Sequence, residues 1–434
     1  MWGKWEIVAL VLFLAMYVLL LTFQKYRAYI ALGTAIVFVA CGILNYTKVL
    51  TAINWNVLLM IGGTMGTVSL FIESKMPAKM ADFIISKTRN VKWTICALAL
   101  FAGIVSAFVD NVATVLMIAP VALTICKKLG ISPVPSLIAI AVSSNLQGAA
   151  TLVGDTTSIM TGAEAGMNFV DFFIMDGKIS MFFITQAGAV VSLLILLLIF
   201  RKETQPVQSM DRTEVTDYFP TIAMAATIVL LIIASFFENF VLIVGGQDIT
   251  NGIICFGVFL IALIYEIARQ KNFGAAKKAF GDIDFFTLLL LMSLFVVIAG
   301  ISEVGIIDRI SGAIASLGGG SVFLTYTIIV WASVILSAFI DNIPYVATML
   351  PVVTSLAAAL AIDPRLLYFG LLVGATLGGN LTPVGASANI AAIGILRKNG
   401  YEVKNKDFFK IGVPFTLAAV ISGYLLVWLI WKPM

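Results

Sequence analysis

The sequence predicts an all-α polytopic membrane protein made of two inverted five-span repeats, each with a re-entrant hairpin and a broken helix. Three observations predict this fold class. Of the 434 residues 61% are hydrophobic and only 12% are charged, with a mean hydropathy of +1.06, so the chain lacks the charge to cover a soluble surface. The apolar residues form blocks long enough to cross a bilayer, which takes roughly 17–25 residues. Similar polar phrases also recur in the two halves of the chain.

Ten of the apolar blocks are predicted to span the membrane. They lie at roughly 5–23, 28–44, 55–72, 133–170, 180–200, 219–244, 251–268, 285–302, 365–396 and 411–431. Two further apolar segments, about 93–126 and about 322–360, are each interrupted in the middle by an Asp–Asn pair.

The basic residues indicate how these blocks are oriented. If the loop after the third span is cytoplasmic, Arg27 and most other basic residues fall inside, as the positive-inside rule favours. Of the 27 Lys and Arg residues only six are then outside: Lys4, Lys48, Lys178, Arg309, Arg365 and Lys432. Both termini are predicted outside, in a bacterial inner (cytoplasmic) membrane. Segment 93–126 lies between Lys92 and Lys127 and would re-enter from inside, whereas segment 322–360 would dip in from outside.

An internal repeat divides the chain. INWNVLLMIGG…FIESKMPAKMADFI (53–84) aligns with IDFFTLLLLMS…GISEVGIIDRISGAI (283–314) at an offset of 230, and the two Asp–Asn pairs align at an offset of 231. Each half has an odd number of crossings, so the halves are expected to be inverted, as in many secondary transporters. The predicted units are a first repeat at 1–200, a polar cytoplasmic linker at 201–218 and a second repeat at 219–434.

Four polar features interrupt the apolar blocks and are expected to meet near the membrane midplane. Two are the hairpin tips, in SAFVDNVATVLMIAP (106–120) and SAFIDNIPYVATMLP (337–351). The other two are helix breaks, in SSNLQGAATLVGDTTSIMTG (143–162) and GATLGGNLTPVGASANIAA (374–392). Unwound backbone at membrane depth is tolerated where it is buried in protein or lines a wet cavity.

These features supply the candidate binding residues. Helix ends, carboxylates and amide or hydroxyl oxygens are suitable ligands for small ions. The candidates for substrate or ion binding are Asp110, Asn111, Thr114, Asn145, Thr151, Gly154, Asp155, Thr156, Thr157, Asp341, Asn342, Asn380, Thr382, Gly385, Ser387 and Asn389. Sodium is expected near Asp110, Asn111, Asp155, Asp341 and Asn342.

Structural roles compete with binding for these residues. Asp110 and Asp341 are suited to cap the second helix of each hairpin, and Ser and Thr often bond their own helix backbone. However, an acid inside a membrane is costly and is by default a functional candidate. Glu73 and Glu303 lie at span ends and are expected at the interface. Segment 75–90 is predicted to form an amphipathic helix on the inner surface.

Several classes of function are not expected. Histidine is absent, which excludes histidine proton relays and metal sites, and the cysteines Cys41, Cys96, Cys126 and Cys255 lie in apolar segments without metal-like spacing. No nucleophile–base pair, nucleotide loop or nucleic-acid motif is present, so neither an enzyme nor a nucleic-acid partner is expected, and no ATPase subunit is implied. The only cofactor expected is a coupling ion, Na⁺ or H⁺.

The motifs resemble those of the ion transporter superfamily, within it the ArsB/NhaD/P-protein permease group with its citrate-transporter-like domain. The motifs that carry the resemblance are the two hairpin phrases and LGGNLTPVGASANIAAIGILRKNGYEV (377–403). The second hairpin phrase and the 377–403 motif look especially like the melanosomal P protein and its bacterial relatives. The resemblance implies a homodimer in which the hairpins and broken helices move as an elevator.

The resemblance also bears on the solute. The dicarboxylate/sodium symporters of this superfamily carry Ser-Asn-Thr at the hairpin tips, where sodium and the substrate carboxylate bind. Here the matching residues begin with Asp110 and Asp341, so a dicarboxylate would meet two acids. Gly-Asp-Thr-Thr-Ser at 154–158 is instead more similar to sodium/proton antiporters of the NhaD type.

Three functions remain open. The first is a secondary active transporter for a small inorganic anion or oxyacid (arsenite-, silicate- or phosphate-like), coupled to H⁺ or Na⁺. The second is a Na⁺/H⁺ antiporter in which Asp110, Asp155 and Asp341 bind either cation. The third is a gated ion channel, for which no carbonyl filter is evident. The sequence places no Lys or Arg in the predicted site, so an anion would depend on helix dipoles or a bound cation.

Overall fold

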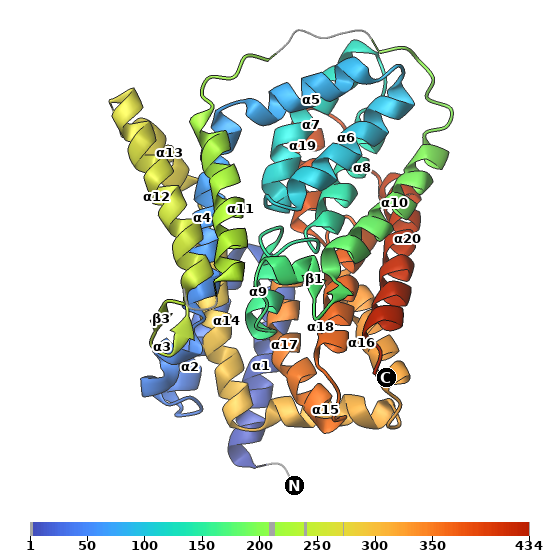
Figure 1. The fold of residues 1–434 in the computed structure, drawn as a ribbon. Helices are drawn as coiled ribbons and strands as arrows, with labels where there is room; N and C mark the ends of the chain where they lie inside the picture. Colours follow the sequence, from blue (N-terminus) through green and yellow to red (C-terminus); the bar gives the residue numbers. More distant parts are fainter. Residues whose placement is uncertain (1–2, 208–212, 238–240, 272, 434) are drawn as a thin grey trace.

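The computed structural model describes residues 3–207, 213–237, 241–271 and 273–433, which form a tall helical bundle (Figure 1). Within these ranges nine helices are long and apolar enough to cross a membrane. They are α1 (Lys4–Thr22), α4 (Trp55–Glu73), α7 (Asn111–Lys128), α10 (Met181–Ile199), α11 (Phe219–Phe236), α12 (Thr250–Gln270), α14 (Phe285–Glu303), α17 (Asn342–Ala359) and α20 (Asn405–Trp431). The all-α membrane fold class is confirmed.

Two predicted spans are shorter than expected. The block at 28–44 is α2 (Arg27–Ala40), a helix of 14 residues that ends because Gly42 adopts a positive φ of 73°. The block at 219–244 yields α11, which ends at Phe236. Its last residues form strand β3 (Ile243–Val244), which pairs with β4 (Gln247–Asp248) around the positive-φ Gly245 and Gly246. A glycine pair of this kind favours a tight hairpin over continued helix.

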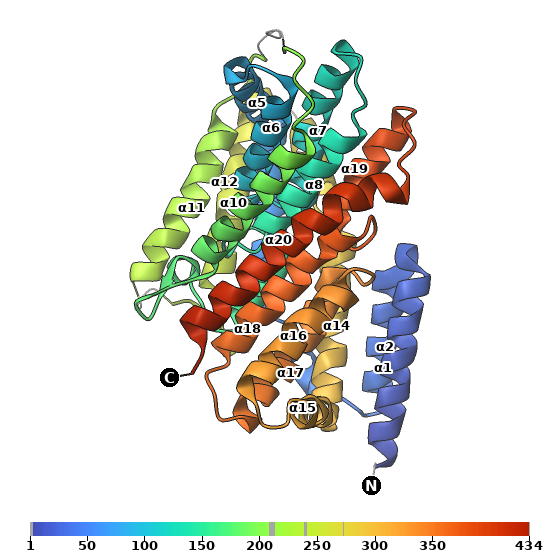
Figure 2. The same cartoon turned by 90° about the vertical axis from the view of Figure 1, so that its right-hand side faces the viewer.

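Two helical hairpins approach each other from opposite ends of the bundle. The first is α6 (Val91–Ser106) with α7, and the second is α16 (Val322–Ser337) with α17. Each hairpin breaks just before its Asp–Asn pair, and its second helix begins at the Asn. Figures 1 and 2 show α6 and α7 in the upper half of the molecule and α16 and α17 in the lower half.

Two further helices are broken near the centre. Helix α8 (Val134–Gln147) ends at a coil that leads to α9 (Thr156–Glu164). In the second half, α18 (Arg365–Leu372) passes through a π-helical turn, Val373–Leu377, and a 3₁₀ turn, Gly379–Leu381, before α19 (Ser387–Lys398). Nearly the whole length of α8 is buried, and it packs against α6, α7, α19 and α20.

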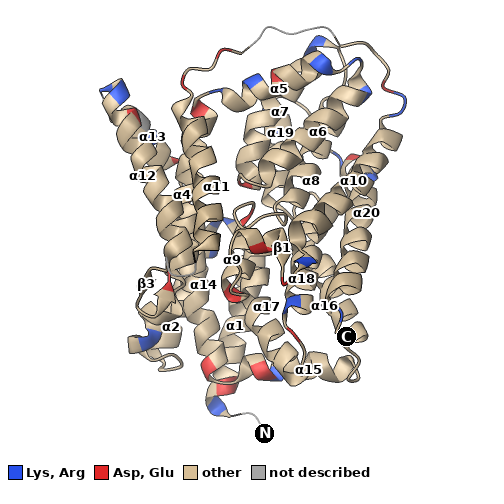
Figure 3. Ribbon diagram, in the orientation of Figure 1, with Lys and Arg blue, Asp and Glu red and all other residues tan. Residues whose placement is uncertain are grey.

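The remaining elements lie at the ends of the bundle. Helix α5 (Met76–Lys87) crosses the top in Figure 1, and α15 (Ile306–Leu317) crosses the bottom. The shorter elements are α3 (Val49–Ala52), α13 (Gly274–Gly281) and the strands β1 (Ile174–Met175) and β2 (Lys178–Ile179), which pair with each other. Most Lys, Arg, Asp and Glu residues gather at the two ends (Figure 3), where Glu303 pairs with Lys48 at 2.6 Å and Glu73 with Lys278 at 3.2 Å.

Candidate functional site

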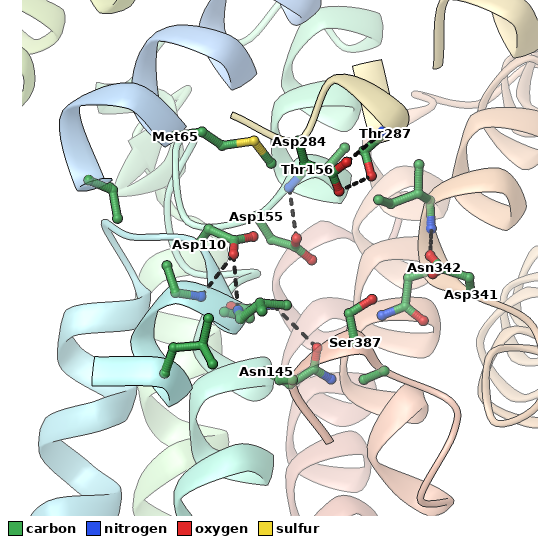
Figure 4. Close-up of a pocket in the computed structure, with 18 of the residues that line it drawn as sticks. Met65, Asp110, Asn145, Asp155, Thr156, Asp284, Thr287, Asp341, Asn342 and Ser387 are labelled. Atoms are coloured by element: carbon green, nitrogen blue, oxygen red, sulfur yellow. Dashed lines mark hydrogen bonds between the residues drawn. The ribbon is translucent and has the colours of Figure 1, made fainter. Parts of the chain in front are cut away.

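A cavity of about 400 Å³ lies where the two hairpin tips and the two helix breaks meet (Figure 4). The first hairpin contributes Asp110 and Asn111, and the second contributes Asp341 and Asn342. The remaining predicted candidates in its lining are Asn145 from α8, Asp155 and Thr156 at the start of α9, and Ser387 at the start of α19. The structure therefore brings together residues from four separate parts of the sequence.

Among the three acids that the sequence predicted for this cavity, Asp110 and Asp155 have no basic partner in the described ranges. One carboxylate oxygen of Asp110 accepts hydrogen bonds from the backbone N–H groups of Val112 (3.0 Å) and Ala113 (3.1 Å) and so caps α7. Asp155 accepts from the backbone N–H of Thr156 (2.8 Å) and from the hydroxyl of Thr157 (2.9 Å). Both side chains are partly exposed, and neither forms an ion pair with any Lys or Arg in the described ranges.

Asp341 is paired with Arg27, which corrects the prediction that no Lys or Arg lies in the site. One Asp341 oxygen accepts from the backbone N–H of Ile343 (3.0 Å) and caps α17, while the other accepts from Nη1 of Arg27. Arg27 follows the α1–α2 turn, which sequence reasoning assigned to the membrane surface. Because this turn lies beside the cavity, its arginine reaches the second hairpin tip.

Two further acids line the cavity that sequence reasoning missed. Asp284 caps α14 by accepting from the N–H (3.0 Å) and hydroxyl (2.6 Å) of Thr287, and Asp282 accepts from the hydroxyl of Ser69 at 2.5 Å. The internal repeat carried a usable signal for Asp284. At the offset of 230, Asp284 aligns with Asn54, which caps α4 by accepting from the Val57 N–H at 3.1 Å. The capping residue is therefore a neutral amide in the first half of the chain and a carboxylate in the second half.

The two tip asparagines line the cavity and also brace the hairpins. Asn111 accepts from the Ser106 hydroxyl (2.6 Å) and donates to Asn145 (3.3 Å). Asn145 donates in turn to the Thr376 carbonyl at 2.7 Å, which links the first helix break to the second half. In the second tip, Asn342 accepts from the Ser337 hydroxyl. These amides therefore have structural partners as well as cavity positions.

The other predicted candidates lie behind the cavity and hold the breaks together. The hydroxyls of Thr151 and Thr382 donate to the carbonyls of Ala107 and Ala338, at equivalent points of the two hairpins. Thr157 contacts both Asp155 and Thr376. The remaining residues of this group are Thr114, Gly154, Asn380, Gly385 and Asn389, none of which is among the cavity-lining residues.

Some of these packed residues show how closely the backbone approaches itself at the two helix breaks. A Cβ on Gly154 would lie 2.8 Å from the Gly148 carbonyl oxygen, and one on Gly385 would lie 2.5 Å from that of Gly379. Asn380 donates to the Val142 carbonyl at 2.9 Å and Asn389 donates to that of Gly379 at 3.4 Å. The sequence predicted that these residues lie near the site. It could not distinguish residues that line the cavity from residues that are packed behind it.

A second cavity of about 510 Å³ adjoins the first. It extends along α1 and its turn, past Tyr17, Gln24 and Lys25. The two cavities share the lining residues Arg27, Val112, Asp284, Asp341 and Ser387. The Arg27–Asp341 ion pair thus stands where the two cavities meet.

Comparisons with known proteins agree with this architecture. The family described as "Citrate transporter" matches residues 17–374, with a second match over residues 240–433. A Mycobacterium tuberculosis protein described as an uncharacterized transporter is 30% identical over 433 residues, which are 98% of each chain. The human P protein is 26% identical over 461 residues, covering 88% of this chain and 54% of the P protein.

Two solved membrane-transporter structures share the fold. The YdaH transporter of Alcanivorax borkumensis superimposes with a TM-score of 0.57 at 16% identity over 88% of each chain. The MtrF transporter of Neisseria gonorrhoeae gives 0.56 at 15% identity, over 89% of this chain and 85% of its own. The resemblance to the permease group is confirmed, and the chain is an integral membrane transporter that belongs to the citrate transporter family of the ion transporter superfamily.

Proposed function

We propose that the chain is a secondary active transporter in which Asp110 and Asp155 bind the coupling cation, H⁺ or Na⁺, and the cavity carries a small inorganic anion or oxyacid. The observation that carries this proposal is the charge pairing in the cavity. Asp341 has a guanidinium partner, whereas Asp110 and Asp155 have only neutral hydrogen-bond donors among the described residues. Asp282 and Asp284 also have neutral donors, but they stand before α14, whereas Asp110 and Asp155 lie at a hairpin tip and a helix break. An unpaired carboxylate in a membrane gains most from binding a proton or a metal cation.

The same charges explain why cation and solute would move together. Five carboxylates and one guanidinium line the cavity: Asp110, Asp155, Asp282, Asp284, Asp341 and Arg27. Like charges about 4 Å apart repel by about 4 kcal/mol at an effective dielectric constant of about 20. An anion would therefore bind weakly until cations neutralise some of the acids. Binding of the anion and of the cation would then be linked, as cation-coupled transport requires.

Na⁺/H⁺ antiport is the second candidate, and the excess of acid in the cavity favours it. In that mechanism Asp110 and Asp155 would bind Na⁺ and H⁺ alternately, and no anion would be needed. The family description names citrate, so citrate belongs among the solutes to be tested. The cavity volume of about 400 Å³ lies within the usual range of small-molecule sites, about 300–1,000 Å³.

We further propose that residues 1–200 and 219–434 are inverted repeats and that transport occurs by alternating access at the cavity. Matched contacts 231 residues apart support the repeat, since Thr151 and Thr382 each bond the carbonyl four residues before the hairpin's Asn. The opposite placement of α5 and α15 supports the inversion (Figure 1). Transporters built from inverted repeats commonly bind their solute at the repeat interface.

The proposal is tested with purified protein in liposomes that hold a trapped pH dye, under an imposed pH gradient with the outside acidic. Arsenite, silicate, phosphate, citrate and chloride are added outside in turn, and Na⁺ and Li⁺ in separate trials. Lumen acidification on addition of a solute supports proton-coupled solute transport. Antiport would carry added Na⁺ or Li⁺ inward and H⁺ outward, so lumen alkalinisation by these cations alone supports antiport. Solute uptake driven by a Na⁺ gradient would identify sodium coupling. The absence of all three responses would contradict both candidates.

A further inference from the structure

We propose that Arg27 is the anion-binding side chain of the cavity and that Asp341 holds it until a proton or cation neutralises the Asp341 carboxylate. This inference rests on the proposed function and names the chemistry of its solute, an oxyanion. The binding event it describes is an exchange in which the guanidinium leaves one carboxylate and bonds the anion that has entered.

The position of Arg27 suits this role. Its side chain is 21% exposed and that of Asp341 is 26% exposed, so both face open space although they lie inside the bundle. Both residues line both cavities, and Arg27 is the only Lys or Arg among the described residues that line the first cavity. A solute moving between the two cavities would pass this ion pair.

The Arg27 guanidinium also has N–H donors that are available for a solute. Nη1 donates to Asp341, and Nη2 makes only a long contact of 3.5 Å with the Thr287 hydroxyl. Arginine carries five N–H donors in a planar fork, which fits oxyanions through two parallel hydrogen bonds. The Asp341 carboxylate, itself an oxyanion, occupies the place that a bound solute would take.

The place of Arg27 beside the second hairpin, and not the capping pattern, explains why Asp341 rather than Asp110 holds the arginine. Asp110 caps its helix with two hydrogen bonds, from Val112 and Ala113. The residue equivalent to Ala113 in the second hairpin is Pro344, which has no backbone N–H. Asp341 therefore accepts only one of these cap bonds, from Ile343. Because both cap bonds to Asp110 go to a single oxygen, each acid keeps a second oxygen for another partner. Only Asp341 meets Arg27, since α1 packs against the second hairpin, where the Tyr17 hydroxyl donates to the Pro344 carbonyl at 2.7 Å.

The charges around the pair make its release depend on cations. Asp282 and Asp284 face the cavity from the segment just before α14, and the first half contributes Asp110 and Asp155. Lys25 faces the second cavity from the α1–α2 turn. With Asp341 ionised, an entering anion must compete with it for Arg27. A proton or Na⁺ on Asp341 removes that competitor, and the anion then meets a free guanidinium.

The test is anion binding to the purified full-length protein, followed as the rise in melting temperature with added phosphate, sulfate or citrate. In Asp341→Asn, Arg27 is free, and Asn still caps the helix. This variant should bind at least one of these probes about tenfold more tightly than wild type at neutral pH, as expected for a gained hydrogen bond to a charged group. Arg27→Gln should lose the anion response, and the double variant should resemble Arg27→Gln.

The opposite signs of the two variants are the decisive result. If the ion pair were only a structural brace, breaking it from either side would change anion binding in the same direction. Lys48→Gln and Glu303→Gln break an ion pair outside the cavity and serve as matched controls, with anion binding expected to stay at the wild-type level. Arg27→Lys keeps the positive charge but cannot form two parallel hydrogen bonds to an oxyanion. It should therefore retain only part of the rise in melting temperature with added anion.

Two outcomes would overturn the inference: no response of Asp341→Asn to any of the three probes, or a response that survives in the double variant. Both are distinct from a failure of the proposed function. That failure would appear as cation-coupled flux that persists in Asp110→Asn, a variant in which the Arg27–Asp341 pair is left unchanged.

Discussion

Asp110 and Asp341 begin equivalent helices at the same cavity, yet only Asp341 is paired with an arginine. The difference follows from the position of Arg27, which lies beside the second hairpin tip and lines both cavities together with Asp341. The two carboxylates therefore meet different partners. We expect Asp110 to act with Asp155 on the coupling cation, and Asp341 to act through Arg27 on the solute.

The first prediction separates the charge of Asp110 from its role as a helix cap. Asp110→Asn should abolish the cation response in liposomes with little loss of stability, because Asn caps helices as well as Asp does. Asp110→Ala should lose the response and also about 1 kcal/mol of stability, the usual cost of removing a cap. Flux and thermal unfolding of the two variants check this. Equal stability of both variants would contradict the capping role.

The second prediction concerns pH when Na⁺ is the cation. A protonated carboxylate no longer binds Na⁺, so the apparent affinity for Na⁺ should fall as the pH is lowered. For one competing proton, the half-saturating Na⁺ concentration should rise by up to about tenfold per pH unit in the acidic limit. Sodium titrations at several pH values measure it. A half-saturating concentration that is independent of pH would show that Na⁺ and H⁺ do not share a site.

The third prediction concerns the glycines of the helix breaks. A Cβ on Gly385 would lie 2.5 Å from the Gly379 oxygen and 2.8 Å from that of Ala338, so Gly385→Ala should destabilise the protein by about 1–3 kcal/mol. Gly154→Ala, with its nearest atom at 2.8 Å, should cost less.

Gly394→Ala is the matched control for these two variants. Gly394 lies in α19, and no atom lies within 4 Å of the position that a Cβ would take there, so Ala should raise helix stability by up to about 1 kcal/mol. Thermal unfolding ranks the three variants. If Gly385→Ala were as stable as Gly394→Ala, the close packing at the second break would be wrong.

The fourth prediction tests the orientation of the chain. Ser86 on α5 and Ser316 on α15 are exposed and lie at opposite ends of the bundle, 230 residues apart in sequence. In a background with the exposed Cys41 replaced by Ala, Cys at position 86 should react with an impermeant thiol reagent only from the cytoplasmic side. Cys at position 316 should react only from outside. Labelling of both from one side would contradict the inverted arrangement.

The general architecture and the location of the cavity could be predicted because they depend on local signals. Long apolar blocks specify the membrane helices, and runs of Gly, Ser and Thr within them mark where the helices break. Doubling of the Asp–Asn phrase then identified both hairpin tips, whose Asp110 and Asp341 line one cavity.

The missing residues depend on tertiary packing. Arg27 and Asp284 stand at the starts of helices, and Asp282 stands at the end of α13, where sequence reasoning expects a membrane surface. Whether such a helix end lies at the surface or beside the cavity depends on how α2 packs against α14 and α14 against α17, which no local pattern records. For the same reason Thr151 and Thr382 could not be recognised as braces, since their partners lie 44 residues away in the hairpins.

The most direct test of the central claim compares Asp110→Asn, Asp155→Asn and Glu303→Gln in the liposome assay. Glu303 pairs with Lys48 outside the cavity, so its variant should behave as wild type. Whichever solute or cation changes the lumen pH in wild type, both Asp variants should leave the lumen pH unchanged on its addition, since neither can carry the cation. A full, wild-type change of lumen pH in either Asp variant would show that its carboxylate does not carry the coupling cation and would contradict the account.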